Sequence, residues 1–403
     1  MSRTSYDRMS AHDAGYLTRE TDTQPLHYVL QLDVAGRLSY DQVRDAVAAR
    51  LARLPLAHRR IREPLIVGRP VWVDDREFAV ERQVVPWEGS LASEVDLDDA
   101  LQVLTTRRLP RDRPLWRLTV GVGPGDRTTL WLSIHHAMMD GSLLVTMLRE
   151  LFGSDEQPAG PWRPRRGPSR AWLLALVLVR GVLLRLRRRP AAAPRSTQPH
   201  DTTLTGPVSA ARAIADTTVS LEAVRRARQR SGATLNDLFL AVVTEALRDY
   251  LQPLPETVLA LVPRNIRRET EATQIGNRAW SMLVPLPTGD DDATSRLTAI
   301  RAATEAGKAS DGTSGTQGWR FDVALTNVAL GGDYAVAGRR VASIRAAVPL
   351  QGENRLVGLL TTLDDDLTVT FTADGDAYPD VHRLAELTGA AWRRLLAPVA
   401  ESA

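Results

Sequence analysis

Apolar and polar residues alternate in the stretch TTLWLSIHHAMMDG, which starts at Thr128. The apolar side chains at 130, 132 and 134 have the period of a strand with one face against a core. After two adjacent histidines, Asp140-Gly141-Ser142 has turn chemistry, and an apolar helical pattern runs from Leu143 to Phe152. The pattern predicts a strand, a short loop, and a helix with an acid near its start.

The same periodicities predict further elements in both halves of the chain. In the first half we expect strands around Val29–Val34, Arg59–Ile61, Pro70–Val73 and Pro114–Val120, and helices at Asp41–Leu54 and Ser93–Leu109. In the second half we expect strands at Arg212–Ser220, Val258–Pro263, Gly276–Thr288, Val341–Pro349, Leu356–Thr362 and Leu367–Ala373, and helices at Leu221–Gln229, Leu235–Leu251, Ala293–Lys308 and Val381–Leu396. Strands that alternate with helices in both halves indicate an α/β protein.

The composition changes sharply between Gln157 and His200, where ten arginines occur without a single acid and prolines recur. Because the whole chain carries only +3, the remainder is net acidic, and basicity is local. Aromatic residues are not interleaved with these arginines, so we expect no nucleic-acid partner. The proline-bracketed segment predicts a linker, with an N-terminal domain at 1–155, the linker at 156–200 and a C-terminal domain at 201–403.

Within this linker, Ala171–Leu186 is apolar nearly all round a helix, interrupted by Arg180 and Gly181. It is shorter than the roughly 20 residues that span a bilayer. One interpretation is a peripheral helix at a membrane or lipid-droplet surface, with the arginines of 163–195 against anionic headgroups. The other is a crossover helix packed against the body, with its arginines solvated. The sequence leaves both open.

The composition also limits the class of protein. A chain of 403 residues that is 43% hydrophobic and 25% charged is typical of a globular protein and is long enough for two cores. The absence of cysteine excludes disulfides and thiolate ligands and fits a reducing compartment. The first residues contain no apolar run of signal-peptide length, so we expect a cytoplasmic protein.

The histidine pair is the candidate catalytic feature. If the strand persists, His135 and His136 point to opposite faces, so only one of them can line a given cavity. A histidine at the end of a strand can serve as a general base near pH 7, and Asp140 can fix the ring or the loop. From these residues alone, a purely structural pair and a metal site both remain open. The chain has neither a cysteine nor an HExxH spacing, either of which would favour a metal. The missing GxSxG turn argues against a hydrolase triad.

Several ordered motifs resemble one family of enzymes. They are Arg113-Pro114-Leu115-Trp116, His135-His136-Ala137-Met138-Met139-Asp140-Gly141, Leu204-Thr205-Gly206-Pro207, Gly232-Ala233-Thr234-Leu235-Asn236-Asp237, Gly276-Asn277-Arg278 and Pro285-Leu286-Pro287-Thr288. This set resembles the bacterial wax ester synthase/diacylglycerol acyltransferase family, within the HHxxxDG acyltransferases that include chloramphenicol acetyltransferase. The resemblance implies two chloramphenicol acetyltransferase-like subdomains, each a mixed sheet covered by helices, with a tunnel at their interface.

The resemblance also implies an activity, with acyl-CoA as donor substrate, a long-chain alcohol or diacylglycerol as acceptor, and no metal or other cofactor. His136 would act as general base without a covalent intermediate. His135 would orient the site and support the backbone, Asp140 would hold the loop, and Gly141 would leave room for the CoA arm. The binding candidates that follow from the resemblance are Asn236 as a possible oxyanion donor, and Asn277 and Ser281 beside the tunnel. Arg117 is a candidate ion-pair partner for Asp140.

The chain departs from the family pattern in its second half. Residues 309–318 form a short Gly/Ser/Thr stretch where members usually carry more helix, and the expected turn at Thr326–Gly332 lacks two prolines. The difference bears on acceptor specificity more than on acyl transfer. Two alternatives therefore stay open: an acyltransferase that uses a carrier-protein donor or a natural-product acceptor, and a non-catalytic lipid-binding homologue.

Overall fold

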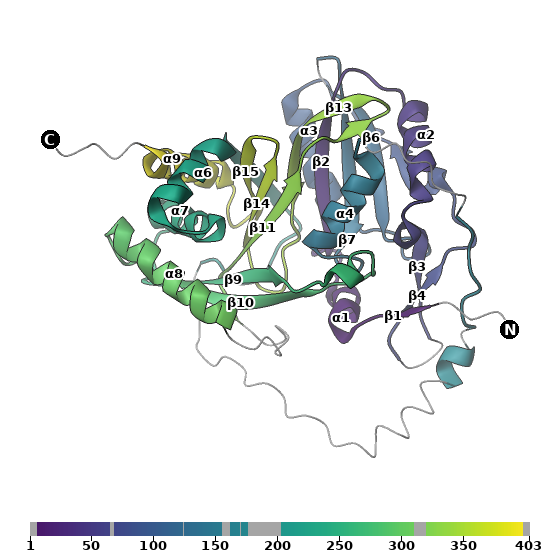
Figure 1. The fold of residues 1–403 in the computed structure, drawn as a ribbon, viewed down its shortest axis with the longest axis horizontal. Coiled ribbons are helices and arrows are strands. Elements are labelled where there is room, and N and C mark those ends of the chain that lie inside the picture. The colour runs from purple at the N-terminus through teal and green to yellow at the C-terminus, as the bar shows by residue number, and fades with distance from the viewer. Residues whose placement is uncertain are drawn as a thin grey trace.

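The computed structural model describes residues 6–64, 68–123, 125–154, 162–169, 171–175, 203–309 and 320–397. Within these ranges two six-stranded sheets lie side by side, and helices cover each of them (Figure 1). Parallel and antiparallel pairs occur in both sheets. The structure thus confirms the predicted α/β fold of two halves, each a mixed sheet covered by helices.

The first sheet has the strand order β12-β13-β2-β7-β6-β5. Its strands are β2 (His27–Ala35), β5 (Val84–Pro86), β6 (Trp116–Gly123), β7 (Arg127–His135), β12 (Ala335–Val336) and β13 (Arg339–Ala347). The other elements of this half are β1 (Asp7–Arg8), β3 (Arg59–Arg62) and β4 (Val71–Asp74), which form a small sheet, the short helices η1 (Pro55–His58) and η2 (Val80–Arg82), and α1 (Ala11–Arg19), α2 (Tyr40–Leu51), α3 (Glu94–Thr106) and α4 (Gly141–Phe152).

Both faces of this sheet are buried. In β7, Leu130 and Leu132 belong to the core cluster that includes the apolar sides of α2 and α4, whereas Trp131 belongs to the cluster around α3. This alternation follows from the two-residue period of a strand. The strand that carries the histidines is therefore held from both sides, which fixes the position of its last residues.

The second sheet has the order β10-β9-β11-β14-β15-β8. Its strands are β8 (Arg212–Ser220), β9 (Val258–Asn265), β10 (Ala279–Leu286), β11 (Val323–Gly331), β14 (Leu356–Leu363) and β15 (Asp366–Asp374), and its helices are α6 (Leu221–Ser231), α7 (Leu235–Tyr250), α8 (Ala293–Ala309) and α9 (Val381–Leu396), with the short η3 (Glu269–Glu271) after β9. As the sequence predicts, Gly232 ends α6 in a left-handed conformation, and Thr234 caps α7.

The second half of the chain adds a strand to the first sheet, which the sequence pattern did not indicate. β13 comes from the second half of the chain, yet it pairs with β2 of the first sheet, so that Ala346 lies opposite Leu30. Residues 335–347 therefore complete the first sheet, although they fall within the predicted C-terminal domain at 201–403. β13 thus connects the two halves beside the candidate site.

The predicted turn at Thr326–Gly332 is wrong. Its residues through Gly331 belong to β11, and Thr326 to Ala329 pair in parallel with β14. The physical reason is the missing prolines, because a proline would remove a ladder donor whereas alanine and leucine donate normally. The segment is consequently a wall of the site and not a loop beside it.

The described parts of the linker lie against the first half. The Trp162 ring stacks on His58 with centroids 4.0 Å apart, and Leu173 packs against Val71 and Val73. Residues 176–202 lie outside the described residues, so most of the apolar helix expected at Ala171–Leu186 lies there too. No helix among the residues described is long and apolar enough to cross a membrane.

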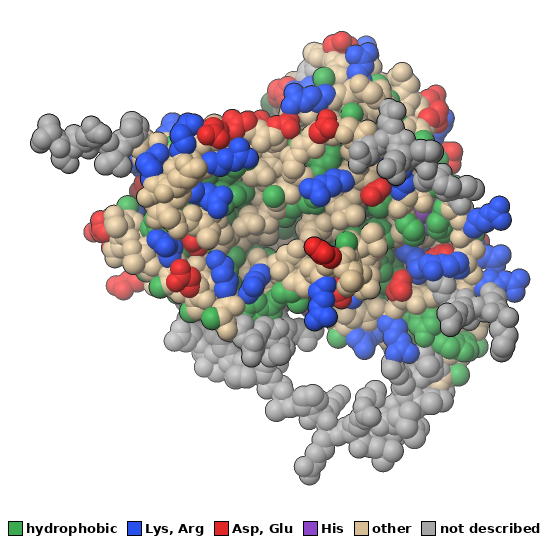
Figure 2. Space-filling model, viewed as in Figure 1, with side chains coloured by type: hydrophobic (Ala, Val, Ile, Leu, Met, Phe, Trp, Pro, Cys, Tyr) green, Lys and Arg blue, Asp and Glu red, His purple; other side chains and the backbone are tan. Residues whose placement is uncertain are grey.

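Charge is mixed on the face drawn in Figure 2. Blue and red side chains are interspersed over both halves, and no broad field of one sign is visible on this face. This face therefore carries charges of both signs.

A long hairpin brings the second half to the first. β9 and β10 extend from the second sheet toward α1, and the connection between them lies beside the loop after β7 (Figure 1). Gly276 N–H donates to the Met138 carbonyl at 2.8 Å, which joins that connection to the histidine loop. The site is built at this junction.

Candidate active site

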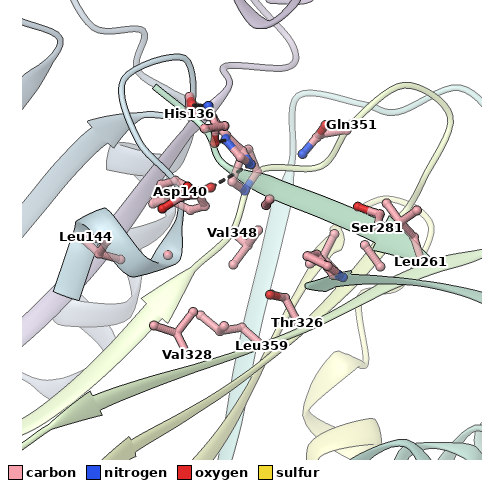
Figure 3. A pocket seen from close by; sticks show the side chains of 18 of the residues that line it. His136, Asp140, Leu144, Leu261, Ser281, Thr326, Val328, Val348, Gln351 and Leu359 are labelled. Atoms are coloured by element: carbon pink, nitrogen blue, oxygen red, sulfur yellow. Dashed lines mark hydrogen bonds between the residues drawn. The ribbon is translucent and has the colours of Figure 1, made fainter. Parts of the chain in front are cut away.

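An apolar cavity of about 390 Å³ lies where the two sheets meet. Leu30 and Ala346 line it from the first sheet, and Leu261, Val328 and Leu359 line it from the second. Figure 3 shows His136 and Asp140 at one side of this cavity and Ser281 and Leu261 at another. The cavity occupies the interface at which the resemblance implies a tunnel.

The end of β7 presents the two histidines to different surroundings. His135 N–H donates to the Leu115 carbonyl at 2.9 Å, and His136 N–H donates to the Leu26 carbonyl at 2.8 Å, so both backbones are fixed. His136 lines the cavity, whereas the side chain of His135 is buried beside Glu20. The prediction that only one of the pair faces a given cavity is confirmed.

Asn277 sets the orientation and tautomer of His136. Its amide Nδ2 donates to Asp13 Oδ1 and to the His136 carbonyl, both at 2.7 Å. Its Oδ1 is left to accept, and it lies 3.1 Å from His136 Nδ1. Nδ1 therefore carries the hydrogen, and Nε2 keeps the lone pair of the neutral ring.

Asp13 holds this amide from the other side. Its Oδ1 also accepts the backbone N–H of Asn277 at 3.1 Å, and its Oδ2 accepts the Ser10 hydroxyl at 2.7 Å. A Cβ on Gly276 would lie 2.7 Å from Asp13 Oδ2, and the backbone there has φ +104, so glycine is needed for both space and conformation. The chain Asp13, Asn277, His136 is thus fixed along its whole length.

Two tyrosines enclose the His136 ring. Tyr16 stacks on it with centroids 4.1 Å apart and planes 12° from parallel. The Tyr28 hydroxyl lies 2.7 Å from His136 Nε2. Because Nε2 has a lone pair and no hydrogen, the hydroxyl donates to it.

Burial of the His136 ring lowers its pKa to about 3, while the contact with Asn277 acts in the opposite direction. The imidazole is consequently neutral throughout the physiological range, which is the form that accepts a proton.

Asp140 fixes the loop that follows the histidines. Its Oδ1 accepts the N–H of Leu143 at 3.0 Å, as the N-cap of α4. Its Oδ2 accepts Arg267 Nη2 at 2.8 Å and the N–H of Arg278 at 2.6 Å. Burial alone would raise the pKa of Asp140, but the hydrogen bonds from Arg267 and the backbone hold that pKa below its ordinary value.

The expected ion pair between Arg117 and Asp140 is wrong, because Arg267 is the partner. Arg117 lies on β6 opposite Ser133, on a strand that runs away from the loop. Arg267 comes from the connection after β9, and it also donates to the Gly276 carbonyl at 2.6 Å. One guanidinium therefore joins the histidine loop to the segment that carries Asn277.

His135 supports the backbone from below the site. Its Nδ1 accepts the Ala137 N–H at 3.0 Å, and its Nε2 lies 3.3 Å from Glu20 Oε1. Burial alone would raise the pKa of Glu20, but the contacts with His135 and Arg111 outweigh it and lower that pKa. The loop after β7 thus rests on a buried, charged cluster.

The remaining predicted residues are placed differently. Gly141 lines the cavity and also a neighbouring depression of about 400 Å³ that contains Arg149 and Arg264. Ser281 lines the cavity on β10, away from His136 (Figure 3). Asn236 is not among the cavity residues, and its Oδ1 accepts Asn327 Nδ2 at 2.7 Å beside the depression. The structure therefore brings Asn277 to His136 and does not bring Asn236 there.

Sequence reasoning missed three contacts of the site. Tyr28 reads as an ordinary aromatic strand residue, and Arg267 reads as one charge in a polar loop. Asp13 lies in the stretch SAHDAGYLTRE near the start of the chain, to which the sequence pattern assigned no role. Within the described ranges, no group of three or more His, Asp or Glu side chains is arranged to hold a metal ion.

Solved structures share this fold. The wax ester synthase/diacylglycerol acyltransferase from Marinobacter aquaeolei VT8 is similar with a TM-score of 0.68 and 18% identity, over 96% of this chain and 98% of that chain. The first condensation domain of the calcium-dependent antibiotic synthetase is similar with a TM-score of 0.66 and 16% identity, over 97% of this chain and 96% of that chain. The fold is thus the two-subdomain fold shared by these transferases and condensation domains.

Sequence relatives narrow the assignment. A Mycobacterium tuberculosis protein named as a candidate diacylglycerol O-acyltransferase is 30% identical over 342 residues, which cover 75% of this chain and 67% of that protein. A similarly named Mycobacterium bovis protein is 27% identical over 406 residues, which cover 87% of each. The model of the wax ester synthase/diacylglycerol acyltransferase catalytic domain matches residues 9–239. The chain belongs to this family of acyltransferases.

Proposed function

We propose that this acyltransferase moves a fatty acyl group from acyl-CoA to the hydroxyl of a long-chain alcohol or a diacylglycerol. The observation that carries the proposal is the position of His136, whose neutral ring lines an apolar cavity between the two sheets. The apolar walls suit an acyl chain, and the ring suits removal of one proton from an acceptor hydroxyl.

In the reaction, the acceptor oxygen attacks the thioester carbonyl as its proton is taken up toward His136 Nε2. The new C–O bond forms, the C–S bond breaks, and the proton returns to the CoA sulfur, so that an ester and a thiol result. Among the described residues, no serine hydroxyl hydrogen-bonds to His136, and the chain has no cysteine. This supports direct transfer without a covalent intermediate.

The neighbouring depression is a fitting entrance for the donor. It meets the cavity at Gly141, where a Cβ would lie 2.7 Å from Val328 Cγ2. Arg149 and Arg264 line the depression and can face the phosphates of CoA. The acyl chain would then pass Gly141 to reach His136.

The test is thiol release from palmitoyl-CoA, with hexadecanol, dipalmitin or a short alcohol offered separately. Acceptor-dependent release that is lost by orders of magnitude in His136→Ala is the expected result. His382→Ala is the matched control, because His382 is exposed on α9 and should leave the rate unchanged. Release only from an acyl-carrier donor would favour the carrier-dependent alternative, and no release from either donor would favour the lipid-binding one.

A membrane contact through 163–195 is a separate proposal. In its described part, Trp172 is 44% exposed beside Tyr6, as an interfacial anchor would be. Sedimentation with vesicles should show binding to anionic and not to neutral lipid, and Trp172→Ala should weaken it. Absence of binding to either kind of vesicle would leave the packed-helix interpretation.

A further inference from the structure

The lone pair of His136 Nε2 is already engaged. The Tyr28 hydroxyl lies 2.7 Å from it, at hydrogen-bond distance. A neutral imidazole nitrogen accepts through one lone pair, so an acceptor alcohol cannot bond to Nε2 while Tyr28 does. A proton from substrate must therefore either wait for Tyr28 to leave or pass through its hydroxyl.

The His136 ring cannot turn to offer Nε2 elsewhere. Tyr16 lies flat on one face, and the Tyr28 ring lies 4.6 Å from it between centroids. At the opposite edge, Asn277 holds Nδ1, and the amide of Asn277 is itself fixed by Asp13. The direction in which Nε2 points is consequently set by groups outside the cavity as well as inside it.

Tyr28 is also fixed at its backbone. It lies on β2 in the interior of the first sheet, opposite Ile134 of β7 and on the same side of the strand as Leu30. The side chain lines the cavity together with His136. A tyrosine oxygen can accept one hydrogen bond while it donates another, so Tyr28 can contact a substrate hydroxyl and Nε2 together.

We propose that Tyr28 is a catalytic residue that relays the proton between the acceptor hydroxyl and His136. The inference rests on the proposed function, since it assigns the path of the same proton. The acceptor O–H gives its proton to the Tyr28 oxygen as the Tyr28 proton passes to Nε2, and the acceptor oxygen bonds to the thioester carbon. When the C–S bond breaks, the same two transfers run in reverse and protonate the sulfur.

The surroundings favour a concerted relay. Burial raises the pKa of Tyr28 well above its ordinary value, and the neighbouring Tyr16 and Asp140 act in the same direction. A free tyrosinate is therefore costly, so the oxygen must gain one proton as it loses the other. The substrate hydroxyl then sits one oxygen further from Nε2 than it would in direct contact.

The test compares wild type with Tyr28→Phe in single turnovers of palmitoyl-CoA and the best acceptor. The relay predicts a rate roughly 100-fold lower, the usual loss of a positioned acid–base group, with little change in KM and in the melting temperature. If Tyr28 instead only blocks Nε2, removing its hydroxyl leaves the rate unchanged or raises it, and this overturns the relay. Tyr250→Phe is the control, because it deletes a hydroxyl hydrogen bond to Asp380 far from the cavity.

A second measurement needs no variant and decides the matter if Tyr28→Phe does not fold. Two protons move together in the relay. A plot of the wild-type rate against the fraction of deuterium in the solvent should therefore be curved. A straight line indicates one proton and overturns the relay. Wild type that releases no thiol with any donor or acceptor contradicts the proposed function and the relay together, whereas an active Tyr28→Phe beside an inactive His136→Ala rejects the relay alone.

Discussion

Asn277 Oδ1 lies 3.1 Å from His136 Nδ1, although the two residues are 141 positions apart in the chain. The contact joins the hairpin of the second sheet to the end of β7 in the first. Because it decides which ring nitrogen carries the hydrogen, it decides which nitrogen can act as the base. The proposed catalysis and the docking of the two halves thus involve the same amide.

Asn277→Leu should therefore lower kcat, and it should also lower the melting temperature, because Asp13 and the His136 carbonyl lose their amide donor. Leucine has a similar size but cannot accept from Nδ1, so the fixed tautomer and the ring orientation are lost. We expect kcat to fall roughly 100-fold, with KM for acyl-CoA within a few-fold of wild type, measured by thiol release.

Its matched control is Asn327→Leu, which removes an amide on β11 that bonds Asn236 and not His136. This variant should retain a kcat close to that of wild type. A small effect of Asn277→Leu, or equal effects of the two changes, would contradict the role given to Asn277. Melting temperatures of both variants separate loss of chemistry from loss of fold.

Arg267→Met should destabilise the protein. Arg267 and Asp140 form an ion pair in which the side chains are only 4% and 6% exposed, so removal of one partner leaves a buried charge. Loss of such a pair typically costs about 3–5 kcal/mol, and urea denaturation would measure it. The histidine loop should loosen as well, with a fall in thiol release.

Arg117→Met is the comparison for this variant, since Arg117 does not contact Asp140. We expect a change in the free energy of unfolding of less than about 1 kcal/mol, as for substitutions away from a buried network. Similar losses of unfolding free energy in the two variants would indicate that the ion pair between Arg267 and Asp140 contributes little to stability.

These two arginines show what the sequence could predict and what it could not. The alternation in β7 and the turn at Asp140-Gly141-Ser142 are local, so periodicity and cap chemistry placed the strand, the loop and α4 correctly. The partner of Asp140 lies 127 positions away and is set by how the hairpin crosses between the sheets. Neither spacing nor composition contains that information, and Arg117 was chosen because its segment lies close to the histidine loop in the family that the chain resembles.

The site residues divide in the same way. Asn277 was singled out by resemblance to a family motif, and the structure brings it to His136. Asn236 was singled out equally, but its position at the start of α7 places it beside the depression and not in the cavity. Tyr28 was missed because an aromatic residue in a strand is most often core, and only the pairing of β2 with β7 reveals its neighbour.

The pH profile of thiol release should lack the inflection that an ordinary histidine causes as it becomes protonated. With the pKa of His136 lowered to about 3 by burial, its neutral form persists well below the ordinary value of about 6.5. We expect kcat/KM to stay nearly constant from about pH 8 down to about pH 5 in short assays. An inflection close to pH 6.5 would show that the ring titrates normally and is better solvated than this structure implies.

The constriction at Gly141 gives a prediction for the donor. A methyl group at this position would lie 2.7 Å from Val328 Cγ2, so Gly141→Ala should narrow the passage between the depression and the cavity. We expect kcat/KM for palmitoyl-CoA to fall about 10-fold, which corresponds to about 1.4 kcal/mol. The double variant Gly141→Ala, Val328→Ala should recover most of that loss, and failure to recover would place the donor elsewhere.

Acid stability should depend on His27, which is buried on β2 opposite His135 and whose Nε2 lies 2.8 Å from the Leu104 carbonyl. Burial lowers its pKa to about 4, so below pH 6.5 the unfolded chain binds a proton that the folded protein does not. The stabilisation is therefore complete above about pH 6.5 and is lost as the pH falls to about 4, by up to about 3 kcal/mol.

Urea denaturation at several pH values should show a shallower pH dependence for His27→Gln, which keeps a donor to Leu104. His382→Gln, at an exposed position, should match wild type, and identical slopes for wild type and His27→Gln would contradict the assignment.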